Sequence, residues 1–256
     1  MKYSLSKRLQ IIANRLQEEG FVQANELAET FHVSMETIRK DLMILEQRGI
    51  AKKEYGGASL ARLGMELQLD MRTSYGDRKQ DVASYAVNLI KESHSLLLDS
   101  GTTCLSCVPL INHLPSMDIF TNSLEAATLL DGKSHNVFLL PGRKREKNEA
   151  VIGNWTEQFL KTIHVDVCLL GTSGIYQSNG PTSHSYQEIG TKQFMIEQSD
   201  LSYVLCDSSK FKEQGLHTYS SWHEVDGIIT DSMISNEILE EYEKITSVYI
   251  AEENNL

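Results

Sequence analysis

The chain has 256 residues, of which 41% are hydrophobic, and a formal net charge of −11. It contains no run of about 18 apolar residues and no apolar segment near its N-terminus, which excludes a membrane-spanning helix and a signal peptide and predicts a cytoplasmic protein with no membrane partner. The charge divides unevenly, with +2 in residues 1–62 and −13 in the remainder. Because an acidic surface repels phosphate groups, any contact with nucleic acid is expected in the N-terminal part.

The N-terminal part predicts three successive helices. Apolar residues at helical spacing mark a first helix over 6–19 and a shorter one over 25–31. Gly20 ends the first helix, and a tight connection at His32-Val33 leads into the third. Three helices joined by turns of this length match the helix-turn-helix plan.

The third helix has the pattern of a helix that reads DNA. Ser34 is placed to cap its first turn, and Gly49 lies where such a helix ends. Ile38, Leu42 and Leu45 form one apolar face, while the opposite face carries short polar groups near the N-terminus and then paired cations. This face suits the major groove of DNA, although taken alone it suits a solvated surface helix equally well.

The residues after Gly49 decide between these two interpretations. Residues 50–55 read as a strand, Gly56-Gly57 as a turn, and the next residues as a short return strand, which together form the wing of a winged helix. The wing adds cations that can contact phosphates beside the groove. The predicted DNA-binding residues are Ser34, Met35, Glu36, Thr37, Arg39, Lys40, Lys52, Lys53 and Tyr55.

We expect a DNA-binding domain over residues 1–58, a linker over 59–76, and a second domain over 77–256 that opens with a helix over 77–90. Within it, apolar runs alternate with helical patterns, and most runs end in a loop rich in Ser, Thr, Gly and Asp. The predicted strands lie at 95–98, 118–120, 136–140, 165–170, 203–206, 227–230 and 248–250. This alternation predicts an α/β domain with a mostly parallel sheet, in which ligands bind outside the carboxyl ends of the strands.

Ser100-Gly101-Thr102-Thr103 offers hydroxyls and backbone N–H groups at a helix start, a combination that suits phosphate. It is neither a Walker A loop nor a dinucleotide fingerprint. A single loop of this kind more often serves only as a turn or cap, but four at one sheet edge favour a small phosphorylated ligand. Lys210 and Arg145 could supply countercharge, and Asp99, Asp207 and Glu188 would suit sugar hydroxyls.

The four cysteines are expected to be structural. Cys104 and Cys107 have C-x-x-C spacing, but no second Cys or His pair lies near enough for a zinc site. Cys168 and Cys206 lie inside apolar runs. An inert pair is favoured over a redox pair, structural disulfides are not expected in a cytosolic chain, and no metal or other cofactor is predicted.

Motifs in both parts of the chain together resemble the DeoR family of bacterial transcriptional regulators. The resemblance is carried by Val33-Ser34, Thr37 to Leu42, Leu45, Gly49, Gly56 to Ala58, Asp99 to Thr103, Thr121 to Ser123, Val151 to Gly153, Glu188 with Lys192, Asp207 to Phe211 and Ile229 to Asp231. It implies a winged helix-turn-helix joined to a sensor domain related to sugar-phosphate isomerases of the ribose phosphate type. It also implies that a phosphorylated sugar binds the sensor and relieves repression of a sugar-catabolism operon.

The predicted effector-binding residues combine the loop analysis with this resemblance. They are Asp99, Ser100, Gly101, Thr102, Thr103, Thr121, Asn122, Ser123, Arg145, Gly171, Thr172, Gly174, Glu188, Lys192, Asp207, Ser209 and Lys210.

Three segments depart from the family pattern. Where Gly-Gly-Glu-x-Arg is usual the chain has Pro-Gly-Arg-Lys-Arg at 141–145, and the segments 171–174 and 188–192 have each lost one carboxylate. Two lost carboxylates and the added cation Arg143 suggest an effector with fewer hydroxyls, or a more anionic one.

The alternative function is a sugar-phosphate isomerase with an appended helical domain. Isomerisation needs a positioned base and a second acid. The loop at 171–174 contains no acid, but Glu188 could still act as a base, so catalysis is disfavoured rather than excluded. A plain scaffold leaves the winged-helix pattern unexplained.

We therefore expect a regulator that is not an enzyme and that binds double-stranded operator DNA as a homodimer or homotetramer, since one recognition helix contacts few phosphates.

Overall fold

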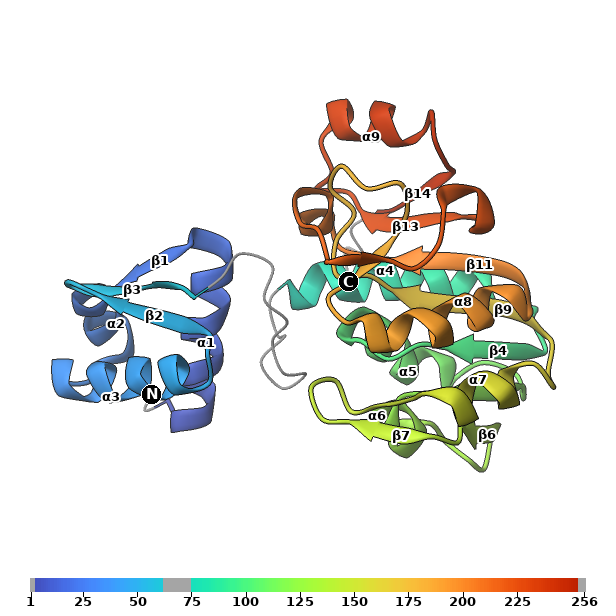
Figure 1. Cartoon of the computed structure of the whole chain (residues 1–256), viewed down its shortest axis with the longest axis horizontal. Coiled ribbons are helices and arrows are strands. Elements are labelled where there is room, and N and C mark those ends of the chain that lie inside the picture. The colour runs from blue at the N-terminus through green and yellow to red at the C-terminus, as the bar shows by residue number, and fades with distance from the viewer. Residues whose placement is uncertain (1–2, 62–74, 253–256) are drawn as a thin grey trace. The chain divides into compact units, whose positions relative to one another are not determined.

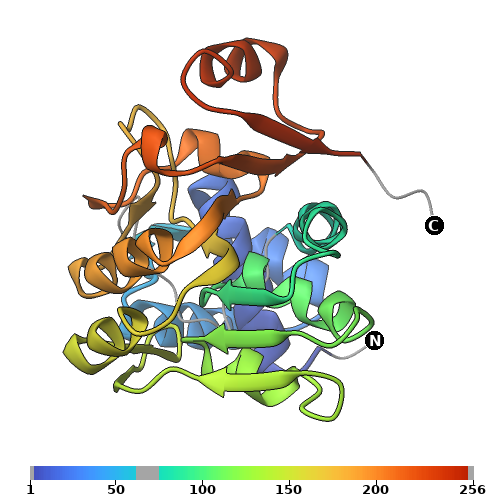
Figure 2. The same ribbon diagram turned by 90° about the vertical axis from the view of Figure 1, so that its right-hand side faces the viewer.

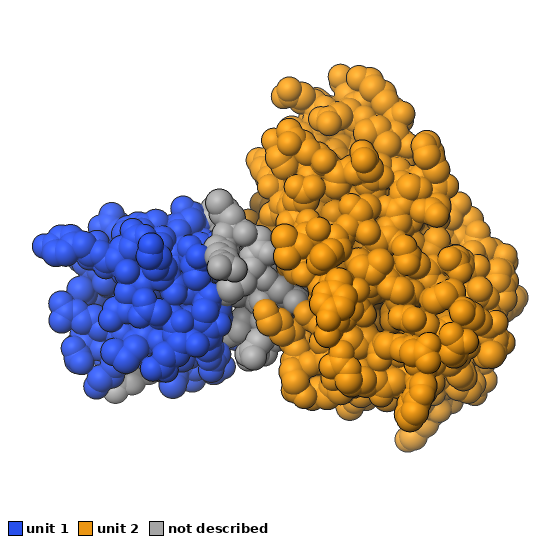
Figure 3. All heavy atoms as spheres, in the orientation of Figure 1, with its two compact units in different colours: residues 1–74 blue, residues 75–256 orange. Residues whose placement is uncertain are grey.

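The structure is a computed structural model that describes residues 3–61 and 75–252 (Figure 1). The chain divides into two compact units, residues 1–74 and 75–256, which Figure 3 colours separately. Each unit has a hydrophobic core of its own. Residues 62–74, which make up most of the predicted linker, lie outside the described residues. No helix among the described residues is both long and apolar enough to cross a membrane.

The N-terminal unit consists of three helices and a three-stranded antiparallel sheet. The helices are α1 (Leu5–Glu19), α2 (Ala24–Phe31) and α3 (Met35–Gln47), and the strands are β1 (Phe21–Gln23), β2 (Ala51–Glu54) and β3 (Gly57–Leu60). The sheet has the order β1-β3-β2. The three helices and the wing are thus confirmed. Strand β1 was not predicted, because three residues are too few to show an alternating pattern.

Helix α3 begins and ends as its sequence predicts. The Ser34 hydroxyl accepts the N–H of Thr37 at 3.2 Å, which caps the first turn. Gly49 has a φ of 71°, and the following N–H, that of Ile50, donates to the carbonyl of Leu45 at 2.9 Å. This is the Schellman arrangement, in which a left-handed glycine ends the helix. The predicted apolar face of α3 is buried against α1 and α2.

The turn of the wing is displaced by one residue from its predicted position. Glu54 pairs with Gly57, so the turn residues are Tyr55 and Gly56 rather than Gly56 and Gly57. Gly56 has a φ of 82°, a conformation that favours glycine. Gly57 lies within β3, where an added Cβ would come within 2.0 Å of the Val22 carbonyl oxygen. Glycine at this position therefore allows β1 to lie close beside β3.

The larger unit is built on a seven-stranded, fully parallel sheet of order β14-β13-β11-β9-β4-β5-β6. Its strands are β4 (Ser95–Leu98), β5 (Asp118–Thr121), β6 (Asn136–Leu139), β9 (Val165–Gly171), β11 (Ser199–Leu205), β13 (Gly227–Asp231) and β14 (Val248–Ala251). The helices are α4 (Gly76–Leu89), α5 (Thr102–Ile111), α6 (Leu124–Leu129), α7 (Asn154–Leu160), α8 (Ile189–Glu197) and α9 (Asn236–Tyr242). The predicted α/β class is confirmed.

Helices cover both faces of this sheet (Figure 2). Leu96 and Leu98 of β4 pack in the core that includes α4 and α5, whereas Leu97, which points to the opposite face, packs with residues of α7 and α8. Successive residues of a strand point to opposite faces of the sheet, and both faces are buried. The strands therefore appear in the sequence as continuous apolar runs.

The order of the strands creates a switch point between β4 and β9. From β4 the chain moves outward through β5 to β6, then returns to the other side of β4 and continues outward through β9, β11, β13 and β14. In a sheet of this kind the crevice at the carboxyl ends of the two central strands is the usual ligand site.

The segment 141–148 was predicted as a loop but contains a strand. β7 (Arg143–Arg145) forms an antiparallel hairpin with β8 (Ala150–Ile152). The charged sequence of β7 hides the strand, because its first two residues are exposed and it has no apolar alternation. Two further short strands, β10 (Thr182–Ser183) and β12 (His217–Thr218), pair with each other.

Candidate functional site

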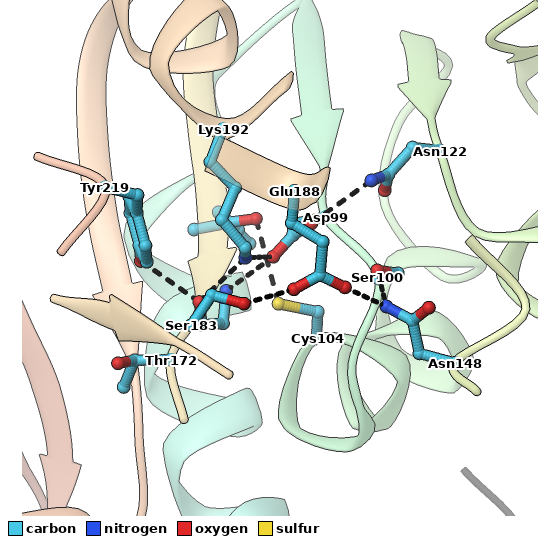
Figure 4. A network of polar contacts seen from close by, with 12 residues as sticks. Asp99, Ser100, Cys104, Asn122, Asn148, Thr172, Ser183, Glu188, Lys192 and Tyr219 are labelled. Atoms are coloured by element: carbon cyan, nitrogen blue, oxygen red, sulfur yellow. Dashed lines mark hydrogen bonds and ion pairs between the residues drawn. The ribbon is translucent and has the colours of Figure 1, made fainter. Parts of the chain in front are cut away.

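Asp99 is the centre of a buried polar network at the switch point (Figure 4). It directly follows β4, and its side chain accepts the N–H of Gly171, at the end of β9, at 2.9 Å. The same carboxylate forms an ion pair with Lys192 of α8, whose ammonium also donates to the Gly171 carbonyl at 2.9 Å. The second carboxylate oxygen accepts from the amide of Asn122 at 3.3 Å. Four predicted site residues from separate segments of the chain thus meet.

A second ion pair lies beside the first, between Glu188 and Arg145, at 3.3 Å. Asn148, from the loop between β7 and β8, donates from its amide to Glu188 and, at 3.1 Å, to the Ser100 hydroxyl. Its amide oxygen accepts from Arg145 at 2.9 Å, and Ser183 donates to the other oxygen of Glu188. The tip of the hairpin therefore joins the predicted phosphate loop to Glu188 (Figure 4).

Lys192 stays charged despite its burial. Burial lowers the pKa of this ammonium, but the carboxylates of Asp99 and Glu188 together raise it by more, so the net pKa lies above its ordinary value. Tyr219 donates its hydroxyl to the Gly171 carbonyl at 3.0 Å, with the Lys192 nitrogen 4.9 Å from the centroid of its ring. Burial, and then Asp99, raise the pKa of Tyr219, so this hydroxyl remains a donor.

The network leaves a few polar groups available to a ligand. The amide oxygen of Asn122 is buried and has no hydrogen-bond partner among the described residues. Gly101, with a φ of 140°, precedes α5, and no side chain caps that helix. The backbone N–H groups of Thr102 and Thr103 therefore have no acceptor within the helix and point out of its N-terminal end. N–H donors, hydroxyls and two ion pairs gathered at one edge of the sheet suit an anionic ligand with several hydroxyls.

Several predicted site residues shape the loops instead of joining the network. Thr121 donates to the Leu98 carbonyl at 2.7 Å, and Ser123 caps α6 by accepting the Ala126 N–H at 3.1 Å. In the loop after β9, the Thr172 hydroxyl accepts the Thr182 N–H at 3.1 Å. In the same loop, a Cβ on Gly174 would come within 2.2 Å of the Glu213 carbonyl oxygen.

The predicted residues after β11 lie at the same edge of the sheet. Asp207 caps a short 3-10 helix (Ser208–Lys212) by accepting the Ser209 N–H at 3.1 Å. The Lys210 ammonium lies 2.6 Å from the Glu213 carboxylate. The second oxygen of Asp207 is buried without a partner among the described residues.

Three members of the network were not predicted, namely Asn148, Ser183 and Tyr219. Each lies in an irregular or very short element, where neither apolar spacing nor a strand end marks a position. Their roles follow from tertiary contacts, since Asn148 and Ser100 are 48 residues apart and Tyr219 and Gly171 are also 48 apart.

The N-terminal unit gathers the predicted DNA-binding residues on α3 and the wing. Met35, Glu36, Arg39 and Lys40 are exposed on α3, and the Ser34 and Thr37 hydroxyls lie 2.9 Å apart at its start. Lys52, Lys53 and Tyr55 are exposed on β2 and its turn.

Asp41, on the opposite face of α3, was read only as part of the family motif, and its packing role was not predicted. It is 1% exposed and accepts two hydrogen bonds from the Arg8 guanidinium of α1, at 2.8 and 3.1 Å. Charge-assisted bidentate pairs fix geometry in both distance and angle. This pair therefore fixes α3 against α1.

The four cysteines are free and buried. Burial raises the pKa of Cys107 to about 12 and that of Cys104 well above its ordinary value, so the thiols of the C-x-x-C pair stay protonated and weakly reactive. No group of His, Cys, Asp and Glu side chains among the described residues is arranged to hold a metal ion.

Comparison with known proteins agrees with both units. Residues 8–62 match the DeoR-like helix-turn-helix domain, and residues 75–232 match the DeoR C terminal sensor domain. Among solved structures, ribose 5-phosphate isomerase A of Methanocaldococcus jannaschii aligns over 54% of this chain and 55% of its own, with 18% identity and a TM-score of 0.39. That likeness is too distant to bear on activity.

Curated relatives align over almost the whole chain. A putative aga operon transcriptional repressor of Escherichia coli O157:H7 is 32% identical over 92% of this chain and 89% of its own length. A lactose phosphotransferase system repressor of Staphylococcus epidermidis is 32% identical, with 94% and 96% covered. The glycerol-3-phosphate regulon repressor of Escherichia coli K12 is 30% identical, with 86% and 88% covered. With both units matched in order, the chain belongs to the DeoR family of transcriptional regulators.

Proposed function

We propose that this protein represses a sugar-catabolism operon by binding its operator through the N-terminal unit, and that a phosphorylated sugar bound in the larger unit releases it from DNA. The observation that carries the effector half is the buried network around Asp99, at the switch point of a parallel sheet, where ligands of such folds bind. The helix-turn-helix and its wing support the DNA-binding half of the proposal.

On the DNA side, α3 enters the major groove and the wing contacts the flanking backbone. Arg39 and Lys40 supply charge to phosphates or to guanine edges, and Ser34 and Thr37 lie at the helix start, where base and phosphate contacts are made. Lys52, Lys53 and Tyr55 contact phosphates next to the groove. All five charged or aromatic residues are exposed.

On the effector side, the phosphate binds at the start of α5, where Ser100 to Thr103 offer hydroxyls and N–H groups. Asp99 and Glu188 accept from sugar hydroxyls, while Lys192 and Arg145 form ion pairs with these two carboxylates. Of the remaining predicted residues, Asp207, Ser209 and Lys210 contribute from the loop after β11, and Thr121 to Ser123 and Gly171 to Gly174 shape the walls.

The relatives support a phosphorylated effector, since their names refer to a lactose phosphotransferase system and to glycerol 3-phosphate. The departures at 141–145, 171–174 and 188–192 favour an effector that is more anionic or carries fewer hydroxyls. Arg143, the added cation, is exposed at the base of the hairpin.

The isomerase alternative is not favoured, because the curated relatives are named as repressors. A base for enediol chemistry must be free to take a proton. Glu188 is instead held by Arg145, Asn148 and Ser183. We therefore propose a binding site without catalysis, in a cytoplasmic protein that acts on DNA as a homodimer or homotetramer, since one recognition helix contacts too few phosphates for useful specificity.

A thermal-shift screen of phosphorylated sugars, with the unphosphorylated sugars as controls, tests the effector half. A phosphorylated compound that raises the melting temperature is then added to the protein on DNA selected from a random library, and release is followed by fluorescence anisotropy. Lys210→Ala should blunt the response and leave DNA affinity unchanged, while the exposed Lys91→Ala should change neither. Stabilisation by neutral sugars alone would overturn the phosphate assignment.

A further inference from the structure

Glu36 is a free carboxylate on the face that we assign to DNA. The other acids of α3 and the wing are engaged within the unit: Asp41 binds Arg8 at 2.8 Å, Glu46 accepts the Lys53 N–H at 2.9 Å, and Glu54 accepts from the Ser59 hydroxyl at 2.7 Å. Glu36 is exposed in the first turn of α3, and its carboxylate has no hydrogen bond or ion pair with any described residue.

The cations of the same helix do not engage Glu36. Lys40 follows it by four residues, a spacing at which Glu and Lys form an ion pair on a helix surface. No such pair is formed, and Arg39 and Lys40 likewise have no ion pair with any described residue. The carboxylate therefore remains available to an external donor.

A free carboxylate is unfavourable near DNA unless it meets a hydrogen-bond donor, because the phosphate backbone repels it. An ionised carboxylate only accepts hydrogen bonds. In the major groove the donors are the N4 amine of cytosine and the N6 amine of adenine, whereas guanine and thymine present acceptors. Adenine also places its N7 acceptor beside N6, where it faces a carboxylate oxygen, so cytosine is the better partner.

We propose that Glu36 determines operator specificity by accepting a hydrogen bond from a cytosine N4 amine at one position of each half-site. The inference rests on the proposed DNA binding and adds a base preference to it. The simpler role for an acid in a first turn is to stabilise the helix through its dipole, which involves no base.

The test selects DNA from a random double-stranded library with the full-length chain and sequences what is retained. Wild type should select a motif with a fixed cytosine. Glu36→Gln should lose the preference for that base by about tenfold and gain adenine there, because a carboxamide pairs with both N6 and N7 of adenine. Glu29→Gln, which removes an equal charge from the exposed surface of α2, is the matched control and should keep the wild-type motif.

The outcomes separate specificity from stability and from charge. If Glu36→Gln only lowers the melting temperature and selects the wild-type motif, Glu36 serves the helix and the inference is wrong. If Glu36→Gln and Glu29→Gln alter selection alike, the effect is general electrostatics and the inference is again wrong. If wild type selects no motif at all, the proposed DNA binding itself fails. If wild type selects a motif without a fixed cytosine, DNA binding stands and the inference about Glu36 is wrong.

Discussion

Arg39 and Lys40 on α3 are exposed and make no ion pair with any described residue, whereas Lys192 and Arg145 in the larger unit are buried and each pairs with a carboxylate. Desolvation explains the difference. An exposed cation is stabilised by water until DNA arrives, but a buried one needs a partner within the protein at all times. We therefore expect the proposed DNA face to bind by adding contacts, and the proposed effector site to bind by exchanging them.

The largest effect should follow from breaking a buried pair. Asp99→Ala leaves the Lys192 ammonium, 4% exposed, without its main partner and should cost about 3–5 kcal/mol of the free energy of unfolding. Urea denaturation followed by tryptophan fluorescence measures it, since Trp155 and Trp222 both lie in the larger unit. The double variant Asp99→Asn with Lys192→Met should recover most of the loss, and equal losses in single and double variants would contradict this account.

The buried pair of Asp41 and Arg8 is an exception to this comparison, because it lies in the N-terminal unit. Asp41→Ala should destabilise this unit by about 2–3 kcal/mol, less than a fully buried pair because the Arg8 side chain is 12% exposed. Thermal unfolding followed by far-UV circular dichroism measures the loss. Replacing both partners, Arg8→Met with Asp41→Leu, should cost less; if it costs more, the pair is not what limits stability.

The exposed cations should affect DNA affinity and leave stability almost unchanged. Arg39→Ala with Lys40→Ala should weaken DNA binding by about 10–100-fold and reduce the slope of log affinity against log salt by about two. Its unfolding free energy should change by less than about 0.5 kcal/mol. Anisotropy titrations at several salt concentrations, with Lys91→Ala as the control, measure the effect. Normal operator binding by the double variant would show that α3 does not enter the groove.

The smallest effect is expected at Asp166, which lies in the sheet away from the candidate site. Backbone N–H groups of His94 and Ser95, which donate to Asp166 at 2.6 and 3.1 Å, hold the pKa of this carboxyl below its ordinary value of 3.8. A pKa lowered by folding stabilises the protein above its unfolded value, and the contribution is lost as the pH falls through the folded pKa. Asp166→Asn should therefore cost about 1 kcal/mol at neutral pH, a difference that narrows below about pH 4 in denaturation curves. A difference that stays constant to acid pH would contradict this.

The sequence predicted the elements that have a periodic pattern of apolar residues. The helices of the N-terminal unit and the parallel strands follow from apolar spacing, and the site loops follow from the ends of those strands. What it could not predict depends on contacts between distant residues. The hairpin of β7 and β8, the pairing of β1 with β3, and the roles of Asn148 and Tyr219 have no local pattern, because their positions are set by partners far away in sequence.

The position of Asn148 has a kinetic consequence. Its amide holds both Ser100 and Glu188, groups that we assign to effector binding, so under this proposal the amide must turn away before the ligand can take its place. Association then includes a first-order step that no excess of ligand accelerates. In stopped-flow mixing, the observed rate should level off at high effector concentration, and Asn148→Ala should make it rise linearly. The delay between the appearance of a sugar phosphate and release from DNA would thus be set within the protein, by one side chain at the tip of a hairpin.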